Sequence, residues 1–387
     1  MSLHGWPVEG DEDKKMLMEQ VGAFARDVVA ANAKHADETG EFPTSIVKQM
    51  AEMGLMGMMV SDEFGGAGLD AISYAMCMEE ISAACASTGV IMSVNNSLVC
   101  WPIDAYGTPD QKKKWLTPLA RGEKLGCFAL SEPSAGSDPG GLKTVATKAD
   151  GGWKIRGTKN FITNGKEADT CIVFANTDPA KGHKGVTAFL VDTKSKGFAV
   201  SKLEDKLGIA ASSTAQLFFD DLFVPADAML GSEGQGMKIA LSTLDGGRIG
   251  IAAQALGIGR CALEASKKFA AEREQFGAPI AKLQAIQFHI ADMATRMQEA
   301  RLLVWNAARM KDLGVRFSKE AAMAKLAASE AAMWTATKAI QVHGGYGYTK
   351  EYVVERNFRD AKITEIYEGT SEIQRIVIAA QEMAEHS

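Results

Sequence analysis

Residues up to about 121 carry apolar side chains at helical spacing. The apolar positions between residues 17 and 28 fall on one face of a helix, and residues 86–100 form a nearly uncharged run that is typical of a buried helix. Residues 107–110 read Gly-Thr-Pro-Asp, which marks a break followed by a new helix start. The pattern predicts an N-terminal helical domain over residues 1–122.

Beyond this domain, short apolar runs alternate with turn residues. Gly151-Gly152 suits the turn of a β-hairpin, and residues 171–175 and 186–191 are apolar runs of strand length. Regularly spaced short strands predict an antiparallel β-barrel or sandwich, which we place at residues 123–230.

A glycine-rich linker at residues 231–236 precedes long helical patterns. The apolar residues between 286 and 304 keep to one stripe with heptad-like spacing, and interruptions follow at residues 317–318 and 343–345. Packed antiparallel helices with short connections predict a helical bundle over residues 231–387. The chain is therefore expected to be an α+β multidomain protein.

Composition and charge exclude several classes of protein. The chain has 387 residues, of which 46% are hydrophobic and 23% charged, as is ordinary for a soluble globular protein with a sizeable core. A formal net charge of −6 argues against a nucleic-acid partner held by bulk charge. The 6 cysteines form no C-x-x-C pair and are expected to be free thiols in a reducing compartment. The N-terminus is polar and acidic, and no apolar run is long enough to span a bilayer, so we expect neither a signal peptide nor a membrane segment.

The strongest candidate for chemistry is the stretch IYEGT at residues 366–370. A carboxylate, Glu368, ends a short apolar run, and the glycine after it lets the backbone turn tightly or approach a ligand. A helix start is expected next, capped by Ser371 with Gln374, and its free N–H groups suit an anion such as phosphate. A solvated loop glutamate beside an ordinary helix cap fits the same pattern.

The run IYEGTSEIQR, preceded by ERNFRDAK at residues 355–362, resembles the C-terminal signature of the acyl-CoA dehydrogenases. The resemblance covers essentially the whole chain and implies an N-terminal helical domain, a middle β-domain and a C-terminal four-helix bundle. It implies that Glu368 removes the α-proton of an acyl-CoA thioester, and burial beside Tyr367 and the flavin would raise the pKa of Glu368 toward that of a useful base. Residues 87–97 add to a similarity that is greatest to the short-chain, butyryl-CoA type.

Two motifs in the expected β-domain resemble the family's flavin site. FALSEPSAGSD at residues 128–138 fits a strand with a polar loop, but in the family the Ser131 position bonds the isoalloxazine and the Ser137 position lies beside the acyl-CoA. KNFITNG fits an ordinary strand and turn, but the family packs the Phe161 position on the flavin and bonds the Thr163 position near N5.

Three motifs in the expected bundle resemble the remainder of the site. LDGGRI fits a charged first helical turn, but in the family the Asp245 and Arg248 positions contact substrate, and Gly247 stands where one subfamily carries its base. In REQFG the Arg273 position, with Gln284 downstream, reaches the cofactor diphosphate and adenosine. The loop QVHGGYGY completes the flavin site of a neighbouring subunit, and its histidine has no second histidine or cysteine at metal spacing.

The matched positions give two sets of candidate residues and no metal site. The resemblance assigns the cofactor to Phe128, Leu130, Ser131, Gly136, Ser137, Phe161, Ile162, Thr163, Arg273, Phe276, Gln284, Gln341, Val342, His343, Gly344, Gly345, Thr370, Ser371 and Glu372. It assigns the acyl-CoA to Ser137, Asp245, Gly246, Gly247, Arg248 and Gly369. Two departures from the family pattern are Gly165-Lys166, at the rim of the site, and Ala210, where most relatives carry arginine.

The resemblance implies FAD-dependent α,β-dehydrogenation of a short-chain acyl-CoA to the trans-2-enoyl-CoA, as in fatty acid β-oxidation. Glu368 would take the pro-R α-proton while flavin N5 takes the β-hydride, and an electron-transferring flavoprotein would accept the electrons. A homotetramer built as a dimer of dimers is expected, in a bacterial cytoplasm or, as a mature form, in the mitochondrial matrix. The alternatives are an acyl-CoA oxidase or another acyl-CoA reaction on the same flavin scaffold, and a helical binding scaffold with a decayed site.

Overall fold

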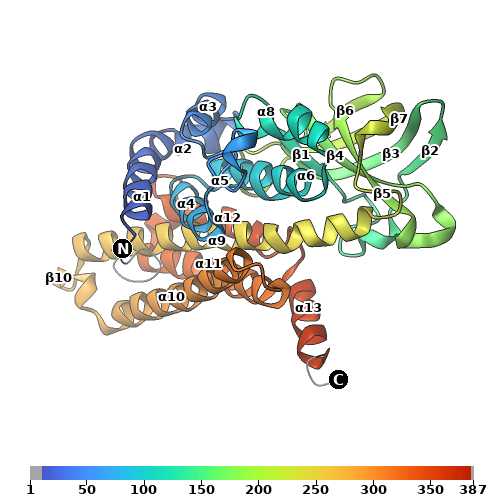
Figure 1. Ribbon diagram of the computed structural model, residues 1–387. Coiled ribbons are helices and arrows are strands. Elements are labelled where there is room, and N and C mark those ends of the chain that lie inside the picture. Colours follow the sequence, from blue (N-terminus) through green and yellow to red (C-terminus); the bar gives the residue numbers. More distant parts are fainter. Residues whose placement is uncertain (1–10, 385–387) are drawn as a thin grey trace.

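The chain runs through a helical part, a part built on a β-sheet and a second helical part (Figure 1). The structure is a computed structural model that describes residues 11–384, so the outer ends of the first and third expected domains, residues 1–10 and 385–387, lie outside the described residues. The order of the elements agrees with the expected succession of an α-, a β- and an α-domain.

The N-terminal helices begin and end where local side chains dictate. Asp11 caps the first helix, because its Oδ1 accepts a hydrogen bond of 3.0 Å from the Lys14 N–H. Residues 86–100 are all buried, as predicted, and Thr108 with Gln111 forms a capping box at the predicted break. The helices are α1 (Glu12–Phe24), α2 (Ala30–Thr39), α3 (Thr44–Glu52), α4 (Ala71–Ala84), α5 (Ala86–Ser93), α6 (Trp101–Tyr106), α7 (Pro109–Gln111) and α8 (Thr117–Ala120), with π-helical turns at Ala25–Val29, Val94–Cys100 and Lys112–Leu116 and a 3-10 turn at Asp62–Phe64.

The middle part is an eight-stranded sheet in the order β6-β7-β3-β2-β4-β5-β8, with β1 beside β4. The predicted turn at Gly151-Gly152 joins β2 and β3 as a hairpin. Most neighbours run antiparallel, but β1 and β2 both pair with β4 in parallel, so the expectation of a purely antiparallel sheet is wrong. The reason is that the β2–β3 excursion returns the chain to the end of the sheet where β1 begins, which places Gly126 opposite Thr170.

The strands pair one after another from β6 at one edge of the sheet to β8 at the other, and in the part of the chain that the structure describes no pairing joins these two edges. Closure into a barrel or sandwich therefore stays a prediction. The strands are β1 (Gly126–Ala129), β2 (Val145–Ala149), β3 (Gly152–Thr163), β4 (Thr170–Asn176), β5 (Val186–Asp192), β6 (Phe198–Leu203), β7 (Thr214–Pro225) and β8 (Met229–Leu230), with 3-10 turns at Pro139–Gly141, Pro179–Gly185 and Ala226–Ala228.

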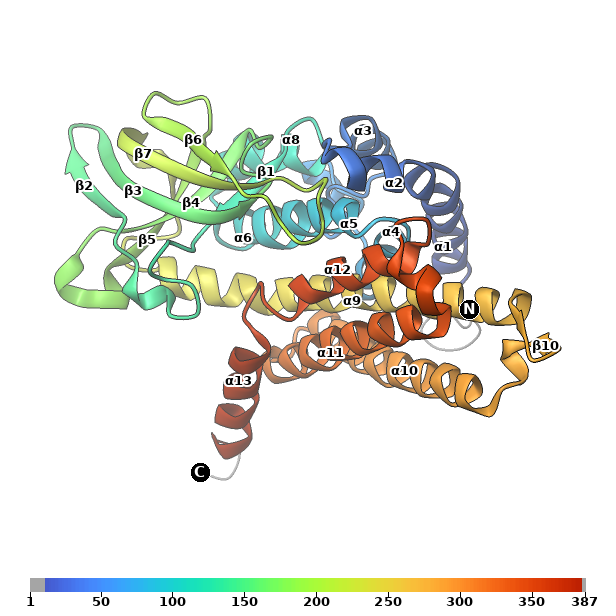
Figure 2. The same cartoon turned by 180° about the vertical axis from the view of Figure 1, so that it is seen from behind.

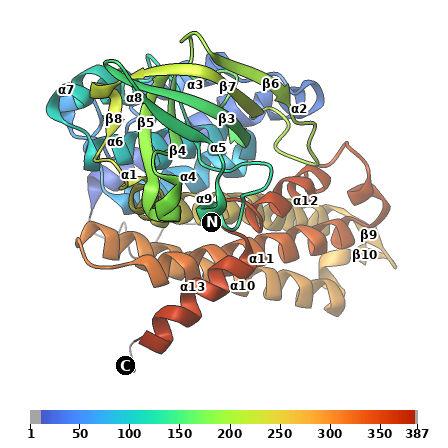
Figure 3. The same cartoon turned by 90° about the vertical axis from the view of Figure 1, so that its right-hand side faces the viewer.

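The C-terminal part is organised around α9, a helix of 37 residues. The sheet and the N-terminal helices lie on one side of α9, and α10 and α11 lie on the other (Figures 1 and 3). The predicted apolar stripe is buried on α10, at Met293, Met297 and Val304. The elements are α9 (Gly236–Glu272), β9 (Glu274–Gln275), β10 (Ala278–Pro279), α10 (Gln284–Asp312), α11 (Ser318–His343), α12 (Val353–Thr364) and α13 (Ser371–Ala384), with 3-10 turns at Ile280–Lys282 and Gly344–Tyr348.

Two features of this part bear on function. Residues 245–248 lie inside α9, so their interpretation as a first helical turn is wrong; the helix already begins at Gly236. Helix α12 packs on α9 and α11. Helix α13 stands out from the rest of the chain but stays in contact with α11 through ion pairs near both of its ends, Arg375–Glu330 and Glu382–Lys319 (Figure 2).

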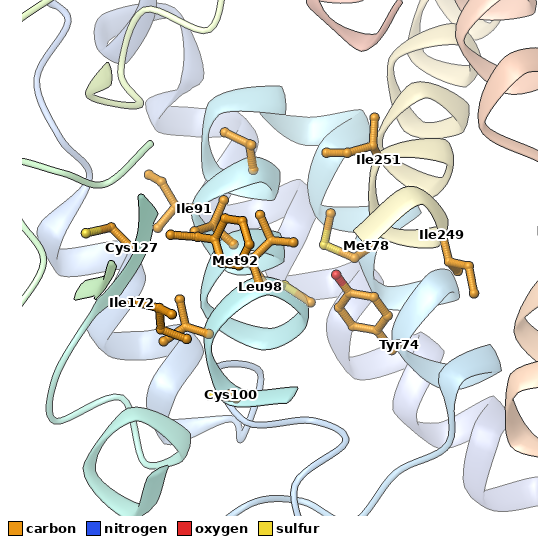
Figure 4. Close-up of a cluster of buried hydrophobic side chains, with 14 of the residues drawn as sticks. Tyr74, Met78, Ile91, Met92, Leu98, Cys100, Cys127, Ile172, Ile249 and Ile251 are labelled. Atoms are coloured by element: carbon orange, nitrogen blue, oxygen red, sulfur yellow. The ribbon is translucent and has the colours of Figure 1, made fainter. Parts of the chain in front are cut away.

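One apolar core runs through all three parts. Figure 4 shows Met78 and Ile91 of the N-terminal helices beside Cys127 of β1, Ile172 of β4 and Ile249 of α9. Burying one such side chain contributes about 1.5–3 kcal/mol. The shared core therefore holds the sheet and both helical parts in a fixed relation, which any site between them requires.

The cysteines agree with the expectation of free thiols. All 6 cysteines are free, and five of them are buried. Within residues 11–384, no helix combines the length and the apolar character that crossing a membrane requires.

Candidate active site

A cavity of about 600 Å³ lies between the sheet, α9 and the turn that joins α12 to α13. It brings together residues from motifs that are far apart in sequence. The predicted site residues in its wall are Phe128, Leu130, Ser131, Gly136, Ser137, Phe161, Ile162, Thr163, Arg248, Glu368, Gly369 and Thr370.

Sequence reasoning missed two further groups of wall residues. Val90, Val94 and Leu98 come from the buried helical run; its lack of charge and the resemblance at residues 87–97 did not single out these side chains as wall residues. Residues 204–209 come from the loop after β6, which carries no motif that points to a ligand.

Glu368 occupies the tightest part of the α12–α13 turn. Its backbone is left-handed, with φ of +52°, and Gly369 follows with φ of +92°. A left-handed conformation costs a non-glycine residue roughly 1–2 kcal/mol, so the turn must be held by its surroundings. Although the residue is half-buried, its Oε2 is shielded from water and has no hydrogen-bond partner. Burial raises the pKa of Glu368 to about 8, against the opposing effect of Lys325 and Arg248.

Gly247 lies on α9 directly opposite this carboxylate. A Cβ placed on Gly247 would collide with Glu368 Oε2 and would lie 2.8 Å from Leu98 Cδ2. A larger residue at position 247 would require the Glu368 and Leu98 side chains to move. A side chain at position 247 and the side chain of Glu368 would therefore occupy the same small volume, entering it from opposite sides.

Arg248 and Asp245 form an ion pair beside the cavity. The Asp245 carboxylate accepts a hydrogen bond of 2.6 Å from Arg248 Nη1 and a second one from the Ser318 hydroxyl. Arg248 reaches the cavity wall and its buried Nε has no partner, while Asp245 lies behind it. The pair offers a guanidinium donor to a polar group in the cavity.

Phe161 presents an aromatic face to the cavity. Its side chain is 63% exposed in this chain, and its backbone is left-handed with φ of +59°. An exposed aromatic ring held in an uncommon backbone conformation is unusual for a core-packing role. Thr163 and Ser131 place hydroxyl groups in the same wall.

A buried ion pair ties the two flavin motifs of the sheet together. Lys159 Nζ donates hydrogen bonds of 2.8 Å to Glu132 Oε1 and 3.0 Å to the Leu130 carbonyl, and both charged side chains are buried. The backbone N–H groups of Lys143 and Thr144 complete the donors to the carboxylate. Burial lowers the pKa of Lys159 to about 8, although Glu132 opposes that shift. Sequence reasoning missed this ion pair. The only hint of it in the sequence was that Lys159 lies in an expected strand next to apolar residues.

A second cavity of about 520 Å³ lies at the opposite end of α9. Arg273 enters it from the end of that helix, 5.4 Å from the ring centre of Tyr346. His343 stacks on Phe269 with ring centres 4.3 Å apart, and its Nδ1 bonds the Ala339 carbonyl at 2.8 Å. The predicted residues in its wall are Arg273, Val342, His343, Gly344 and Gly345. The structure therefore divides the predicted cofactor residues between two separate cavities of one chain.

Several predicted residues lie outside both cavity walls. Phe276 is 92% exposed on the β9–β10 hairpin, Gln284 begins α10, and Gln341 is exposed on α11. Ser371 and Glu372 form the first turn of α13, next to the first cavity. Gly246 faces Lys311, on a different side of α9 from Glu368.

The cap of α13 differs from the predicted capping box. Thr370 Oγ1, not Ser371, accepts the Ile373 N–H at 3.3 Å, so the Ser371–Gln374 assignment is wrong. The reason is that Gln374 points back into the turn, where its Nε2 donates to the carbonyl oxygens of Glu368 and Gly369 at 3.2 and 2.8 Å.

The residues present fit flavin adenine dinucleotide, with the isoalloxazine ring and the diphosphate-adenosine part at different places. The first cavity offers an open aromatic face at Phe161 and buried polar atoms without partners at Glu368 Oε2 and Ser371 Oγ. In the second cavity a Cβ on Gly344 or Gly345 would meet nothing within 4 Å, which leaves backbone open to a ligand. Within residues 11–384, no group of His, Cys, Asp and Glu side chains is arranged to hold a metal ion.

Comparisons with known proteins agree across the chain. Three family models match, described as the N-terminal domain (residues 11–123), the middle domain (127–222) and the C-terminal domain (234–383) of acyl-CoA dehydrogenase. The mitochondrial short-chain specific acyl-CoA dehydrogenase of Bos taurus is 54% identical over 373 residues, which are 96% of this chain and 90% of that protein.

Two solved structures share the fold over nearly the whole chain. Butyryl-CoA dehydrogenase from Megasphaera elsdenii superposes with a TM-score of 0.95 and 42% identity, covering 99% of this chain and 100% of the other. A chain from work on the electron transferring flavoprotein of Acidaminococcus fermentans and flavin-based electron bifurcation superposes with a TM-score of 0.96. Its sequence identity is 45%, and the match covers 99% of this chain and 100% of the other.

Proposed function

Because the chain belongs to the acyl-CoA dehydrogenase family and is thus a flavin-dependent oxidoreductase, we propose that it converts a short-chain acyl-CoA to the trans-2-enoyl-CoA in fatty acid β-oxidation. The observation that carries this proposal is the buried, unpartnered Glu368 carboxylate, which faces a cavity beside Phe161. A carboxyl group with a raised pKa and no partner suits the transfer of a proton.

We propose that Glu368 accepts the α-proton of the thioester at its carboxylate. The Glu368 N–H, held by the turn, is a donor for the thioester oxygen, which gains negative charge as the proton leaves. Phe128, Leu130, Ser131, Phe161, Ile162 and Thr163 would hold the isoalloxazine of FAD, which supplies the hydride acceptor when bound. The apolar wall excludes water from the carboxylate and keeps it basic.

The acyl chain and the electron acceptor are proposed from the comparisons. The 54% identity to a short-chain specific enzyme supports a short, unbranched acyl group. The likeness to a chain studied with an electron transferring flavoprotein supports that class of protein as the acceptor. The division into residues 1–122, 123–230 and 231–387 is part of this proposal, as is a location in a bacterial cytoplasm or mitochondrial matrix.

Anaerobic mixing with a panel of acyl-CoAs tests the function. We expect butyryl-CoA to bleach the flavin absorbance faster than octanoyl-CoA or isovaleryl-CoA does, because the chain is 54% identical to a relative named as specific for short chains. The stopped-flow bleaching rate at matched concentrations is the measurement. Faster bleaching by the longer or branched substrate contradicts the short-chain assignment, and peroxide formed in air at the full turnover rate would indicate an oxidase.

We also propose a homotetramer, built as a dimer of dimers, with one FAD per chain. Helix α13 stands out from the chain with Ile376 62% exposed, and residues 342–345 line a cavity far from the Glu368 cavity (Figure 2). A neighbouring copy that packs on α13 and offers its loop would complete the binding site for the dinucleotide. Each chain alone would hold only part of the cofactor.

Light scattering of the purified holoenzyme is expected to give a mass close to four times 41.3 kDa. Ile376→Lys should disperse the tetramer and release FAD, since it places a charge on the exposed apolar face. Phe223→Lys, a matched change at an exposed apolar residue of β7, should leave both unchanged. A monomeric parent with one bound FAD would refute the proposed assembly.

A further inference from the structure

Lys325 lies on α11 beneath the turn that carries Glu368, and it is fully buried. Its Nζ donates a hydrogen bond of 2.7 Å to the Gly369 carbonyl oxygen. Within residues 11–384, no carboxylate oxygen forms an ion pair with this ammonium group. Fully buried lysines are rare, because removing the charge from water is costly. The position of Lys325 therefore calls for an explanation beyond filling space.

The hydrogen bond of Lys325 acts on the backbone next to Glu368. The Gly369 carbonyl also accepts from Gln374 Nε2 at 2.8 Å, and the same amide reaches the Glu368 carbonyl at 3.2 Å. Two consecutive left-handed residues form this turn, and left-handed backbone is unfavourable for glutamate. Donors from α11 and α13 thus hold one turn from two sides, which fixes where the Glu368 carboxylate and N–H point.

The charge of Lys325 acts on the carboxylate itself. Burial raises the pKa of Glu368 to about 8. Two cations, Lys325 and Arg248, oppose this rise, and Lys325 has the greater effect. Arg248 is paired with Asp245, which offsets part of its charge. Burial also lowers the pKa of Lys325 to about 8, while Glu368 favours its charged form. The two groups therefore support each other's ionised state.

Among the described residues, the other titratable groups near Glu368, apart from the paired Arg248, supply no positive charge that could take the place of Lys325. Glu365 and Glu372, at the two ends of the turn, favour the charged form of Lys325. Tyr74 of α4 and Tyr367 face Glu368 as hydroxyl groups, and burial together with that carboxylate raises the pKa of both. Neither tyrosine supplies positive charge.

We propose that Lys325 is a positioning residue for the base: it holds the Glu368–Gly369 turn by a hydrogen bond and supplies positive charge that favours the ionised form of the carboxylate in a cavity shielded from water. This inference rests on the proposed role of Glu368 in accepting the α-proton. It assigns a part in the reaction to a residue that touches neither the acyl-CoA nor the flavin.

The test is the pH profile of flavin bleaching by butyryl-CoA in Lys325→Met, which keeps the length of the side chain and removes its charge. Loss of a nearby cation raises the pKa of a carboxyl group, so the acid limb of the profile should move to higher pH by about one unit. The variant should be roughly tenfold slower than the parent on the acid side, because one unit is a factor of ten in ionised carboxylate. At high pH, where Lys325 of the parent loses its own proton, the two rates should differ only by the smaller, pH-independent effect of the hydrogen bond to the Gly369 carbonyl that the variant lacks.

Two matched variants separate charge from structure. Gln374→Met removes the other donor to the turn without removing a charge, so it should slow bleaching at every pH and leave the acid limb in place. Ser329→Ala, one turn along α11 at an equally buried residue, should change neither rate nor profile. A profile of Lys325→Met that superimposes on the parent would overturn the inference.

Folding and function are separated by two further outcomes. Lys325→Gln, which retains a donor for the Gly369 carbonyl, is the second variant, and the same shift is expected of it. If neither variant yields folded enzyme with bound FAD, Lys325 is needed for folding and the inference of a positioning role is refuted. If no acyl-CoA bleaches the parent, the proposed function falls first, and the inference falls with it.

Discussion

Glu368→Gln is expected to keep FAD and bind butyryl-CoA, yet to lose nearly all of the chemical step. Glutamine has the same size and fits the same turn, but it cannot accept the α-proton. Positioned general bases contribute about 10²- to 10⁴-fold, so the loss should be about 3–5 kcal/mol of transition-state stabilisation. The measurement is the rate of anaerobic flavin bleaching after rapid mixing. Bleaching at near the parent rate would show that the assignment of the base is wrong.

The control for this prediction moves the carboxylate instead of deleting it. A Cβ on Gly247 points at the present location of Glu368 Oε2, so Gly247→Glu combined with Glu368→Gly should place a carboxylate in the same volume. Part of the lost rate should return in the double variant. Gly247→Glu alone should be damaging, because two carboxylates would then compete for one site. Recovery in the double variant alone would show that the requirement is for a carboxylate at this place and not for residue 368 itself.

The acid limb of the parent profile follows from the environment of Glu368. Burial raises its pKa to about 8, and only the ionised form accepts a proton. The rate of bleaching should therefore rise with pH through about 8 in the parent and should lose this dependence in Glu368→Gln.

Lys159→Met is expected to destabilise the sheet and to weaken FAD binding. The change leaves the buried Glu132 carboxylate with backbone donors but no cation. Breaking a buried pair by removing one partner typically costs about 3–5 kcal/mol. The flavin loop and strand β3 should lose their common anchor at the same time. The measurements are the thermal midpoint of the holoenzyme and the fraction of FAD retained after gel filtration.

Two controls belong to this prediction. Arg156 lies on β3, as Lys159 does, and forms an ion pair with Asp221 of β7. Both side chains of this pair are exposed, so little change is expected of Arg156→Met. Adding Glu132→Gln to Lys159→Met removes the unpaired charge and should recover part of the lost stability. If Lys159→Met is as stable as Arg156→Met and retains FAD, the buried pair does not hold the two motifs.

The sequence was most informative where chemistry and local structure share one short stretch. Glu368 was singled out because the run IYEGTSEIQR resembles a family signature, whereas the turn and helix start alone fit a solvated loop glutamate equally well. Lys325 and Lys159 could not, because a lysine is usually solvated and its burial depends on elements far away in the sequence. The parallel pairing of β1 with β4 could not be predicted for the same reason, because the alternation of apolar and polar residues along a strand does not show which strand it pairs with. Lys325 stood within an alanine-rich run, which in retrospect is its one local signal.

Helix α9 carries glycines at points of closest contact with the rest of the chain. Gly247 faces Glu368, Gly257 faces the backbone of α4, and Gly259 faces Met297 of α10. Each interior glycine costs a helix about 1 kcal/mol relative to alanine, so a segment of this kind is a poor helix by itself. We expect α9 to be fully formed only when all three parts of the chain have packed against it. Assembly of the active site and cooperative folding are then one event, and a partly folded chain would have no base in place and no residual catalysis.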